Sequence, residues 1–382
     1  MQVTQPRNVN PKSLQIGRQA LDSPFIVAPM AGMTDTAFRR LVKRHGGCGL
    51  VVTEMVSSEG LVRGIDRTLE FAEYTEEERP VSIQIFGGDP AKMADAAEIV
   101  EALGANIVDV NMGCPVPKIA KHNAGCSLMR EPDHAASVIA AMTRRVKIPV
   151  TVKMRAGWNE ESINAPELAK HVEGAGASAV AVHGRTAAQS YSGHSDWSLI
   201  DRVAESVKIP VLGSGDCTEP EDILERMGTG VSGVLVGRGV LRNPWILAQA
   251  ADLAAGRPAR EVTLADRGQF LLEYMELLLT EDGSEPTGFR HRAGQNHSPN
   301  PQSPADRPRH ERWVVNKLRA LMSWYSKGLH NGGQLRTAIN AAGSVSEARD
   351  IIVQFFTTAD VARAQTLGVR ANRRTAYVGL ST

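Results

Sequence analysis

The chain has 382 residues, of which 42% are hydrophobic and 22% charged, and its formal net charge is +1. A chain of this length can bury at least one large core, and its N-terminal stretch MQVTQPRNVNPKSLQIG lacks the apolar segment of a signal peptide. No run approaches the roughly 18 apolar residues of a membrane span, and the 4 cysteines are too few for a disulfide framework. We therefore expect a cytoplasmic protein with reduced thiols and no membrane segment.

Short apolar runs rich in β-branched residues recur along the first two thirds of the chain, at intervals of about 25 to 30 residues. Each run is nearly continuous, which is typical of a parallel strand buried on both faces. Helical patterns such as PAKMADAAEIVEALG separate the runs. Eight strand–helix units predict a (β/α)8 TIM barrel, with a doubly wound sheet as the alternative. The runs are FIVAPM (25–30), LVVTEM (50–55), VSIQIF (81–86), IVDVNM (107–112), VTVKMR (150–155), AVAVHG (179–184), PVLGSG (210–215) and GVLVGR (233–238).

The unusual residues of this region cluster where the runs end. The segments concerned are APMAG, TEM, QIFGG, NMGCP, KMRAG, HGRT, GSGDC and GRG. In a barrel of this type the C-terminal ends of the strands carry the active site, whereas the opposite end serves stability. This clustering predicts an enzyme.

Glycine-rich turns follow the seventh and eighth runs. GSGD (213–216) and GRG (237–239) stand where such barrels commonly bind phosphate, because glycines let backbone N–H groups approach an anion. Arg238 would supply a counter-charge, unless it is a surface arginine at the rim of the barrel. No Cys or His pair has the usual spacing of metal ligands, so we expect no metal site.

Polar side chains near the ends of apolar strands suggest a ring-shaped cofactor. Gln84 and Lys153 occupy such positions, where an unpaired polar group is costly. The alternatives are a satisfied buried amide for Gln84 and a barrel salt bridge for Lys153. A cation beside the pyrimidine edge of a flavin would stabilise the negative charge that appears on reduction. His183 either contacts the cofactor phosphate or the substrate, or is a hydrogen-bonded core histidine.

The stretch NMGCPVPKIAKHNAGCSLM (111–129) places a cysteine at a bend. Gly113 and Pro115 both dictate backbone angles, so Cys114 is held on a turn and is not packed along a regular element. A thiol with an ordinary pKa of about 8.5 is mostly protonated at neutral pH and is able to serve as an acid. We expect the other three cysteines to be packing residues.

Helical patterns replace the strand–helix alternation beyond about residue 262. Residues 283–310 interrupt them with Pro, Ser, Asn and Arg and show no periodicity. We predict a barrel over 1–261, a small C-terminal helical domain over 262–365 with a disordered insertion at 283–310, and a tail at 366–382. Residues 286–382 contain 14 basic and 5 acidic residues, a balance of +9. This excess predicts contact with a polyanion, and the alternative is a solubilising surface with a basic loop.

Taken together, the motifs resemble the tRNA-dihydrouridine synthase family, FMN-dependent barrels that reduce uridine in RNA, and most closely its bacterial B-type branch. The resemblance covers residues from about 15 to 282 and from about 313 to 356. It implies FMN as cofactor, NADPH or NADH as reductant, and tRNA as substrate, and we expect a monomer. The motifs that carry it are APMAGMTDTAFR, NMGCPVPKIAKHNAGCSLM, VTVKMRAGW, VHGRT and VGRGVLRNPWI.

The resemblance also implies roles for individual residues. Cys114 matches the catalytic acid that protonates C5 after hydride transfer from flavin N5 to C6, and Asn111 and Arg155 match positions that handle flavin and target base. Ser214 stands where the B-type pattern usually has Asn. The implied cofactor-binding residues are Pro29, Met30, Ala31, Gln84, Lys153, His183, Ser214, Gly215, Asp216, Gly237 and Arg238.

Two other functions remain open at this point. One is a small-molecule FMN oxidoreductase of similar barrel type, which the basic helical region disfavours. The other is a non-catalytic RNA-binding protein, which the intact set of Cys114, Lys153 and Arg155 disfavours. Oxidation of reduced flavin by RNA would separate the first from the synthase, and a flavin spectrum would argue against the second.

Overall fold

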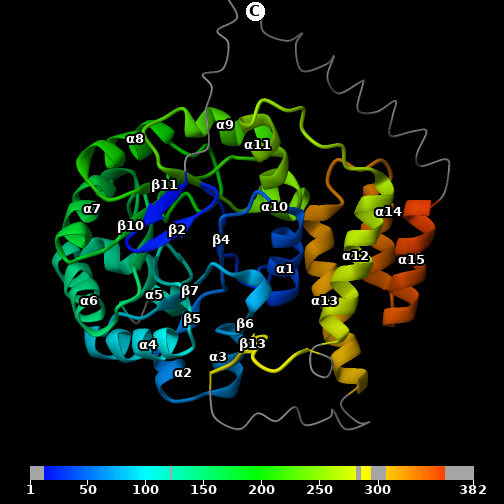
Figure 1. The fold of residues 1–382 in the computed structure, drawn as a ribbon, viewed down its shortest axis with the longest axis horizontal. Coiled ribbons are helices and arrows are strands. Elements are labelled where there is room, and N and C mark those ends of the chain that lie inside the picture. The colour runs from blue at the N-terminus through cyan, green and yellow to red at the C-terminus, as the bar shows by residue number, and fades with distance from the viewer. Residues whose placement is uncertain (1–12, 121–122, 281–284, 294–306, 358–382) are drawn as a thin grey trace, which may run out of the picture. The chain divides into compact units, whose positions relative to one another are not determined.

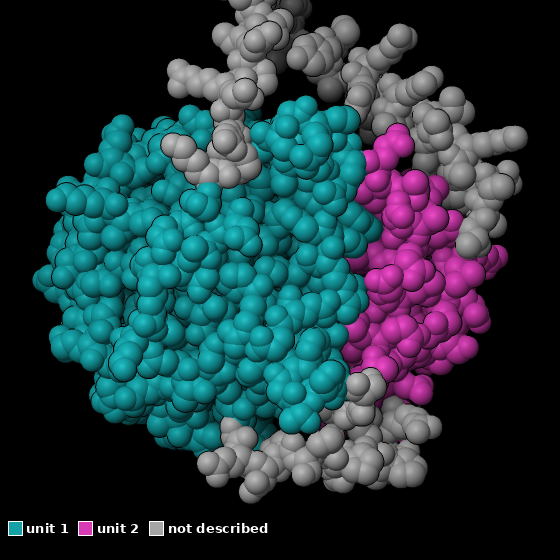
Figure 2. Space-filling view, in the orientation of Figure 1, with its two compact units in different colours: residues 1–260, 285–297 teal, residues 261–284, 298–382 magenta. Residues whose placement is uncertain are grey.

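The computed structural model consists of two compact units (Figures 1 and 2). Unit 1 comprises residues 1–260 and 285–297, and unit 2 comprises residues 261–284 and 298–382. Within them, the residues that the structure describes are 13–120, 123–280, 285–293 and 307–357. The predicted tail at 366–382 lies outside the described residues.

Unit 1 is built around a closed parallel sheet, which confirms the predicted TIM barrel and excludes the doubly wound alternative. Among the described residues, eight strands pair in a ring, each coinciding with one of the predicted apolar runs. The ring closes because the first strand pairs with both the second and the last. In chain order the strands are β3 (Phe25–Val27), β4 (Leu50–Val52), β7 (Val81–Phe86), β8 (Ile107–Met112), β9 (Val150–Arg155), β10 (Ala179–His183), β11 (Val211–Ser214) and β12 (Gly233–Val236).

Helices surround the barrel and cover the outer faces of its strands (Figure 1). Their starts follow local rules. Asp35 accepts a hydrogen bond from the Phe38 N–H at 2.9 Å, and Asp89 caps the next long helix, whose first residue is Pro90. The outer helices are α1 (Thr36–His45), α4 (Pro90–Ala102), α6 (Pro132–Arg145), α7 (Ala165–Gly174), α8 (Trp197–Ser206), α9 (Pro220–Met227) and α11 (Ile246–Ala254).

An N-terminal hairpin, β1 (Leu14–Ile16) and β2 (Gln19–Leu21), closes the end of the barrel opposite the active-site end. Its buried residues Leu14, Ile16 and Leu21 belong to one apolar cluster with inward-facing strand residues. Apolar side chains therefore fill the barrel at the N-terminal ends of its strands, and the polar groups lie toward the C-terminal ends.

Short helices and strands lie in the connections between the barrel strands and the outer helices. The β4–β7 connection contains β5 (Val56–Ser57), α2 (Ser58–Val62), α3 (Asp66–Phe71), β6 (Tyr74–Thr75) and the 3-10 helix η1 (Glu76–Glu78). The other connections contain α5 (Pro117–Ala120), η2 (Gly125–Arg130), η3 (Glu160–Ser162) and α10 (Arg238–Arg242).

The described part of the predicted insertion differs from the expectation of disorder. Residues 285–293 belong to unit 1, where β13 (Arg290–His291) pairs antiparallel with β6. Arg290 forms ion pairs with Glu285, at 2.6 Å, and with Glu73. Backbone pairing and nearly buried charges thus order a segment that lacks any apolar periodicity. Residues 283–284 and 294–306 lie outside the described residues.

Unit 2 is a helical bundle, as predicted. Its core includes Phe270 and Tyr325, whose rings stack at 5.5 Å, and the Tyr325 hydroxyl donates to the Arg267 carbonyl at 2.9 Å. The predicted insertion at 283–310 ends earlier than expected, since a helix already begins at residue 307. The helices are α12 (Leu264–Leu279), α13 (Arg307–Tyr325), α14 (Gly332–Ala341) and α15 (Val345–Thr357).

No helix in the described part of either unit is long and apolar enough to span a bilayer.

Candidate active site at the C-terminal ends of the barrel strands

Strand register brings the predicted site residues to the same end of the barrel. Asn111 on β8 lies beside Lys153 on β9, and Arg155, two residues further along β9, lies beside His183 on β10. His183 in turn lies beside Ser214 on β11. Residues that are paired on adjacent parallel strands lie side by side at the same height in the barrel. Site residues that are over a hundred positions apart in the sequence are therefore brought together at one end.

The bend that carries Cys114 is anchored through its backbone on three sides. The Asn111 side-chain oxygen accepts hydrogen bonds from the Gly113 and Cys114 N–H groups, at 3.1 and 2.9 Å. The Arg155 Nε donates to the Gly113 carbonyl at 2.8 Å. The Cys126 N–H donates to the Cys114 carbonyl at 3.1 Å. These bonds hold the thiol in one place relative to the barrel mouth.

The hydrogen bond between the Cys126 N–H and the Cys114 carbonyl depends on the glycine before Cys126. Gly125 has φ +60°, and a Cβ there would lie 2.8 Å from the Cys114 carbonyl oxygen. A side chain at this position would both strain the backbone and displace the bend. The glycine in NAGCSLM therefore supports the cysteine in NMGCP.

The environment of Cys114 keeps its thiol protonated. Burial raises its pKa above the ordinary thiol value, and this effect outweighs the Val116 backbone hydrogen bond and the Arg155 charge, which both lower the pKa. The side chain is only half-buried, so it remains reachable from the barrel mouth. A positioned, protonated thiol is suited to donate a proton and is not activated as a nucleophile.

Lys153 projects into the barrel as a cation without a hydrogen-bonding partner among the described residues. Its pKa is lowered from 10.5 to about 8, mainly by burial and then by the Arg155 charge, while Asp109 opposes the change. It lines an internal cavity together with Pro29, Asp109 and Ser82, whose buried hydroxyl also has no partner in the described chain. The rest of the cavity lining is mostly apolar and reaches down to Ile16 of the N-terminal hairpin, so the cavity belongs to the barrel interior. It is the cation without a described partner that fits the edge of an electron-rich ring.

Gln84 is a satisfied buried amide as well as a candidate ring contact. Its Nε2 donates to the Asp109 carboxylate at 2.7 Å, and its Oε1 accepts from the Asn111 Nδ2 at 2.8 Å. The Thr151 hydroxyl donates to the other Asp109 oxygen at 2.6 Å. The two interpretations of Gln84 offered by the sequence are thus compatible, since each amide NH2 carries a second hydrogen.

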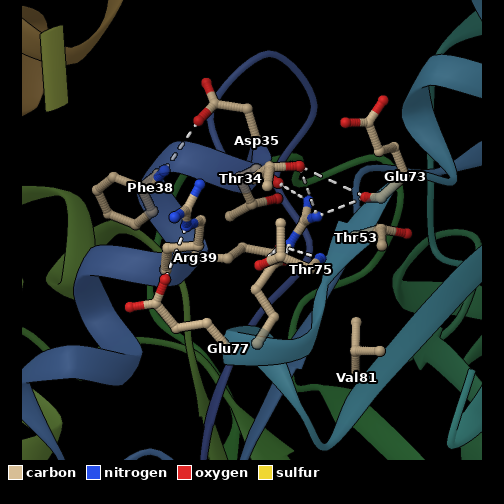
Figure 3. Close-up of polar contacts among 12 residues, drawn as sticks. Thr34, Asp35, Phe38, Arg39, Thr53, Glu73, Thr75, Glu77 and Val81 are labelled. Carbon is tan, nitrogen blue, oxygen red and sulfur yellow. Dashed lines mark hydrogen bonds and ion pairs between the residues drawn. The ribbon is translucent and has the colours of Figure 1, made fainter. Parts of the chain in front are cut away.

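The loop after β3, which holds Pro29, Met30 and Ala31, is fixed by a buried arginine on α1 (Figure 3). Arg39 donates to the Thr34 carbonyl at 2.6 Å and forms a buried ion pair with Glu78 at 2.5 Å. The Thr34 hydroxyl accepts from the Met30 N–H at 3.1 Å. The motif APMAGMTDTAFR thus forms one unit, in which its last residue holds its first ones in place.

The turn after β11 presents unused backbone donors. In the described chain, the Gly215 and Asp216 N–H groups donate no hydrogen bond, and both residues have positive φ, +126° and +53°. The carboxylate of Asp216 is already engaged by the Ser195 N–H at 2.6 Å and by Arg185 at 2.7 Å. Burial raises the pKa of Asp216, but these partners outweigh it and hold the pKa below its ordinary value. The backbone, not the carboxylate, is therefore free to bind an anion.

Four cations surround His183 and make this part of the mouth strongly positive. Burial first, and then the charges of Lys153, Arg155, Arg185 and Arg238, lower the His183 pKa to about 2, so the imidazole is neutral. Such a cluster of cations next to unused N–H groups favours a phosphate. Among the described residues, no group of three or more His, Cys, Asp or Glu side chains could hold a metal ion.

Gly237 and Arg238 lie on the same side of the mouth. A Cβ on Gly237 would lie 3.5 Å from the Met30 sulfur, which brings the turn after β12 next to the loop after β3. Arg238 lies 3.7 Å from Asp216 and 5.1 Å from the ring centre of Tyr191. Ser214 is buried and, apart from its strand pairing, its backbone carbonyl accepts from the Ser195 hydroxyl at 3.1 Å.

Several residues of the site were not identified from the sequence. Arg185 was part of the quoted HGRT motif, but nothing separated it from a surface arginine, whereas in the structure it is 2% exposed and holds Asp216. Asp109 sits inside the run IVDVNM, and a charged residue there was a signal that could have been used. Arg39 was quoted only as the end of a motif.

Basic side chains in unit 2 fall into two kinds. Arg319 donates to the Ala342 carbonyl at 2.8 Å and supports the bundle. Lys327 extends over the half-buried Trp324 ring at 3.9 Å, and Tyr325 is fully buried, so these two aromatics belong to the packing of the unit. The cations with exposed side chains on the described helices include Arg309, Arg312, Lys327 and Arg336.

The chain is similar to known proteins over most of its length. The family model for dihydrouridine synthase (Dus) matches residues 26–298. A probable tRNA-dihydrouridine synthase of Rickettsia bellii is 37% identical over 350 residues, which cover 90% of this chain and 98% of the relative. The tRNA-dihydrouridine synthase B of Xanthomonas campestris pv. campestris is 38% identical over 279 residues, covering 72% and 83%.

A solved structure of 2-naphthoyl-CoA reductase matches with a TM-score of 0.50 and 14% identity, over 66% of this chain and 53% of that chain. At this level of identity the match shows a shared fold.

Proposed function

The chain belongs to the dihydrouridine synthase family, and on that premise we propose that it reduces specific uridines in tRNA to 5,6-dihydrouridine. FMN is the proposed cofactor and NADPH, or NADH, the proposed reductant. The observation that carries the proposal is Cys114, a protonated thiol on a backbone-anchored bend beside a cationic barrel mouth. We further propose a monomeric enzyme that acts in the cytoplasm.

The described residues fit FMN. The unused N–H groups of Gly215 and Asp216, with Arg238 and Arg185 nearby, would hold its phosphate. Lys153 and Gln84 would meet its ring system from β9 and β7, and a cation there favours the reduced, more negative ring. When bound, reduced FMN would supply a hydride to C6 of the uracil.

Cys114 would complete the reaction from its own side of the base. Uracil C6 is electrophilic because it is conjugated with the C4 carbonyl, so reduction at C6 leaves negative charge at C5 and O4. The Sγ–H of Cys114 would donate its proton to C5, and the anchored bend would supply the orientation that this transfer needs. The thiolate formed would later regain a proton from solvent, since the side chain is half-buried.

Arg155 would act mainly by holding the mouth in shape. It is 4% exposed, and besides the Gly113 carbonyl it donates to the Thr186 and Ser190 carbonyls, both at 2.9 Å. Its Nη2 group donates no hydrogen bond within the described residues and would be left for the target base, which must be turned out of the folded RNA to enter the mouth. The exposed cations of unit 2 would bind the RNA backbone.

The experiment uses the full chain loaded with FMN and reduced by NADPH, mixed with tRNA transcripts, with dihydrouridine measured by mass spectrometry. Cys114→Ala should still allow NADPH to bleach the flavin, while dihydrouridine formation falls by about 10²- to 10⁴-fold. Cys126→Ala is the matched control, because that buried thiol supports the bend only through its backbone N–H. Undiminished product from Cys114→Ala would remove Cys114 from the proposed role. Absence of product from the wild type with every tRNA tested would refute the proposed function.

A further inference from the structure

Inside the barrel, a continuous chain of hydrogen bonds leads from Asp109 to the bend of Cys114. The Asp109 Oδ2 accepts from the Gln84 Nε2 at 2.7 Å, and the Gln84 Oε1 accepts from the Asn111 Nδ2 at 2.8 Å. The Asn111 Oδ1 then accepts from the Gly113 and Cys114 N–H groups. The side chains of all three linking residues are buried, with exposures of 6%, 1% and 8% for Asp109, Gln84 and Asn111.

The groups at both ends of this series of hydrogen bonds dictate the direction in which the Gln84 and Asn111 amides point. Backbone N–H groups can only donate, so Asn111 must turn its oxygen to the bend and its NH2 group to Gln84. Gln84 must then present its oxygen to Asn111 and its NH2 group to Asp109. The chain is consistent only if residue 109 offers an acceptor at that end.

We propose that Asp109 is a positioning residue of this enzyme, whose Oδ2 atom fixes the orientation of the Gln84 and Asn111 amides and thereby holds the bend that presents Cys114. The inference rests on the proposed role of Cys114 as the acid. Asp109 acts at a distance, through two side chains, and touches neither the base nor the thiol.

Loss of the Asp109 Oδ2 acceptor would weaken the next hydrogen bonds in the series, from Gln84 to Asn111 and from Asn111 to the bend. Without it, the Gln84 NH2 group has no acceptor at residue 109, and only the bond from the Asn111 Nδ2 opposes a flip of the Gln84 amide, which would set two NH2 groups against each other at Asn111. A matching flip of Asn111 would place an NH2 group against the Gly113 and Cys114 N–H groups, and a donor facing a donor forms no bond. Once Asn111 has flipped, the bend loses its side-chain anchor, and the thiol moves.

Acceptance by Asp109 does not require its negative charge. The Thr151 hydroxyl meets the other oxygen, Oδ1, at 2.6 Å, so Oδ2 remains an acceptor whether or not the carboxyl carries a proton on the Oδ1 side. An asparagine can place its oxygen toward Gln84 and its NH2 group toward Thr151. Asp109→Asn is therefore the conservative variant that should preserve the chain, whereas Asp109→Leu keeps the branched shape and removes the acceptor.

The test uses the full chain loaded with FMN, as wild type, Asp109→Leu, Asp109→Ala, Asp109→Asn and Thr151→Val. The last variant is a control that removes the hydrogen bond to Oδ1 and leaves the acceptor for Gln84. Two rates are measured: single-turnover formation of dihydrouridine by chemically reduced enzyme, and alkylation of Cys114 by iodoacetamide, followed by peptide mass spectrometry. Alkylation of Cys48, a half-buried thiol that precedes β4 and takes no part in the hydrogen bonds between Asp109 and the bend, is the internal reference.

Asp109→Leu should slow single-turnover reduction by about 10- to 100-fold, the scale of effect of a small misplacement of a catalytic group. It should also raise the alkylation rate of Cys114, relative to Cys48, by about threefold or more as the bend loosens. Asp109→Asn and Thr151→Val should stay within about threefold of the wild type in both rates.

Three results would overturn the inference. The first is an unchanged Cys114 alkylation rate in Asp109→Leu. The second is an Asp109→Asn variant as impaired as Asp109→Leu, because charge and not the acceptor would then be responsible. The third is loss of folding in both Asp109→Leu and Asp109→Ala, because the acceptor would then serve the stability of the barrel. A wild type that forms no dihydrouridine would count against the proposed function alone, since the alkylation rates still report on the bend.

Discussion

Replacing Lys153 with methionine should make the flavin-free protein more stable. In the folded chain, burial lowers the pKa of this lysine from 10.5 to about 8, and no hydrogen bond from the described residues compensates for the lost hydration. The difference corresponds to about 3 kcal/mol at pH 7, at about 1.4 kcal/mol per pH unit. The side chain keeps some solvent contact, so we expect about half of this, or about 1–2 kcal/mol, to be recovered by the methionine. Methionine has nearly the same length and fills the same space.

The stabilising effect should depend on pH in a defined direction. Between about pH 8 and pH 10.5 the unfolded chain binds a proton on Lys153 that the folded chain has lost, so the stability of the wild type rises with pH across this window. The methionine variant lacks this rise. Its advantage should therefore be full below pH 8 and should shrink by about 1 kcal/mol by pH 9.

The assay is urea denaturation of the flavin-free chain at pH 7 and pH 9, with the difference between variant and wild type taken at each pH. Lys170→Met, on the exposed face of α7, is the control and should show no pH-dependent difference. The same Lys153 variant should bind FMN more weakly, measured by flavin fluorescence. A Lys153→Met protein that is less stable than the wild type at pH 7, or whose advantage does not change with pH, would refute the reasoning.

Further predictions concern the thiol, the ordered insertion segment and the basic helices. Because burial raises the pKa of the Cys114 thiol above its ordinary value, the single-turnover rate should be constant around neutral pH and fall only in the alkaline range. NADPH-dependent bleaching should not follow that curve. A fall centred below the ordinary thiol pKa of about 8.5 would contradict the prediction. Arg290→Met breaks two nearly buried ion pairs and should lower the free energy of unfolding of unit 1, measured in urea, by about 2–4 kcal/mol. The control Arg309→Met, at an exposed position, should leave this free energy unchanged. An Arg290→Met variant as stable as the wild type would show that the pairs contribute little. Arg312→Gln should lower the slope of log affinity for tRNA against log salt by about 0.9, whereas Arg319→Gln should lower the stability of unit 2; an unaltered slope would exclude Arg312 from phosphate contact.

The sequence allowed the barrel to be predicted strand by strand because its strands are buried on both faces. Each such strand must be almost wholly apolar, and a run of this kind is visible without knowledge of its partners. The site could be located for a related reason: polar and glycine residues that interrupt apolar runs are costly unless they serve a purpose. Hence Lys153 and Gln84, which stand out from their runs, were recognised as candidates.

Residues whose importance lies in a partner were harder to recognise. Arg185 resembles any arginine until its guanidinium is seen to meet Asp216, and Arg39 resembles a helix-surface residue until Glu78 and the Thr34 carbonyl are seen around it. The same holds for residues 285–293, whose order comes from strand pairing and from charges on a distant part of the chain.

Local patterns along the chain were thus sufficient for the identity of the fold, the end of the barrel that carries chemistry, and the presence of a thiol on a bend, because each follows from burial and backbone angles of consecutive residues. Three properties became evident from the folded molecule: the direction of the amides between Asp109 and Cys114, the upward shift of the thiol pKa, and the lack of a hydrogen-bonding partner for Lys153 within the described residues. Those properties depend on which groups from separate strands contact one another in a low-dielectric interior, and these contacts cannot be read from spacing along the sequence.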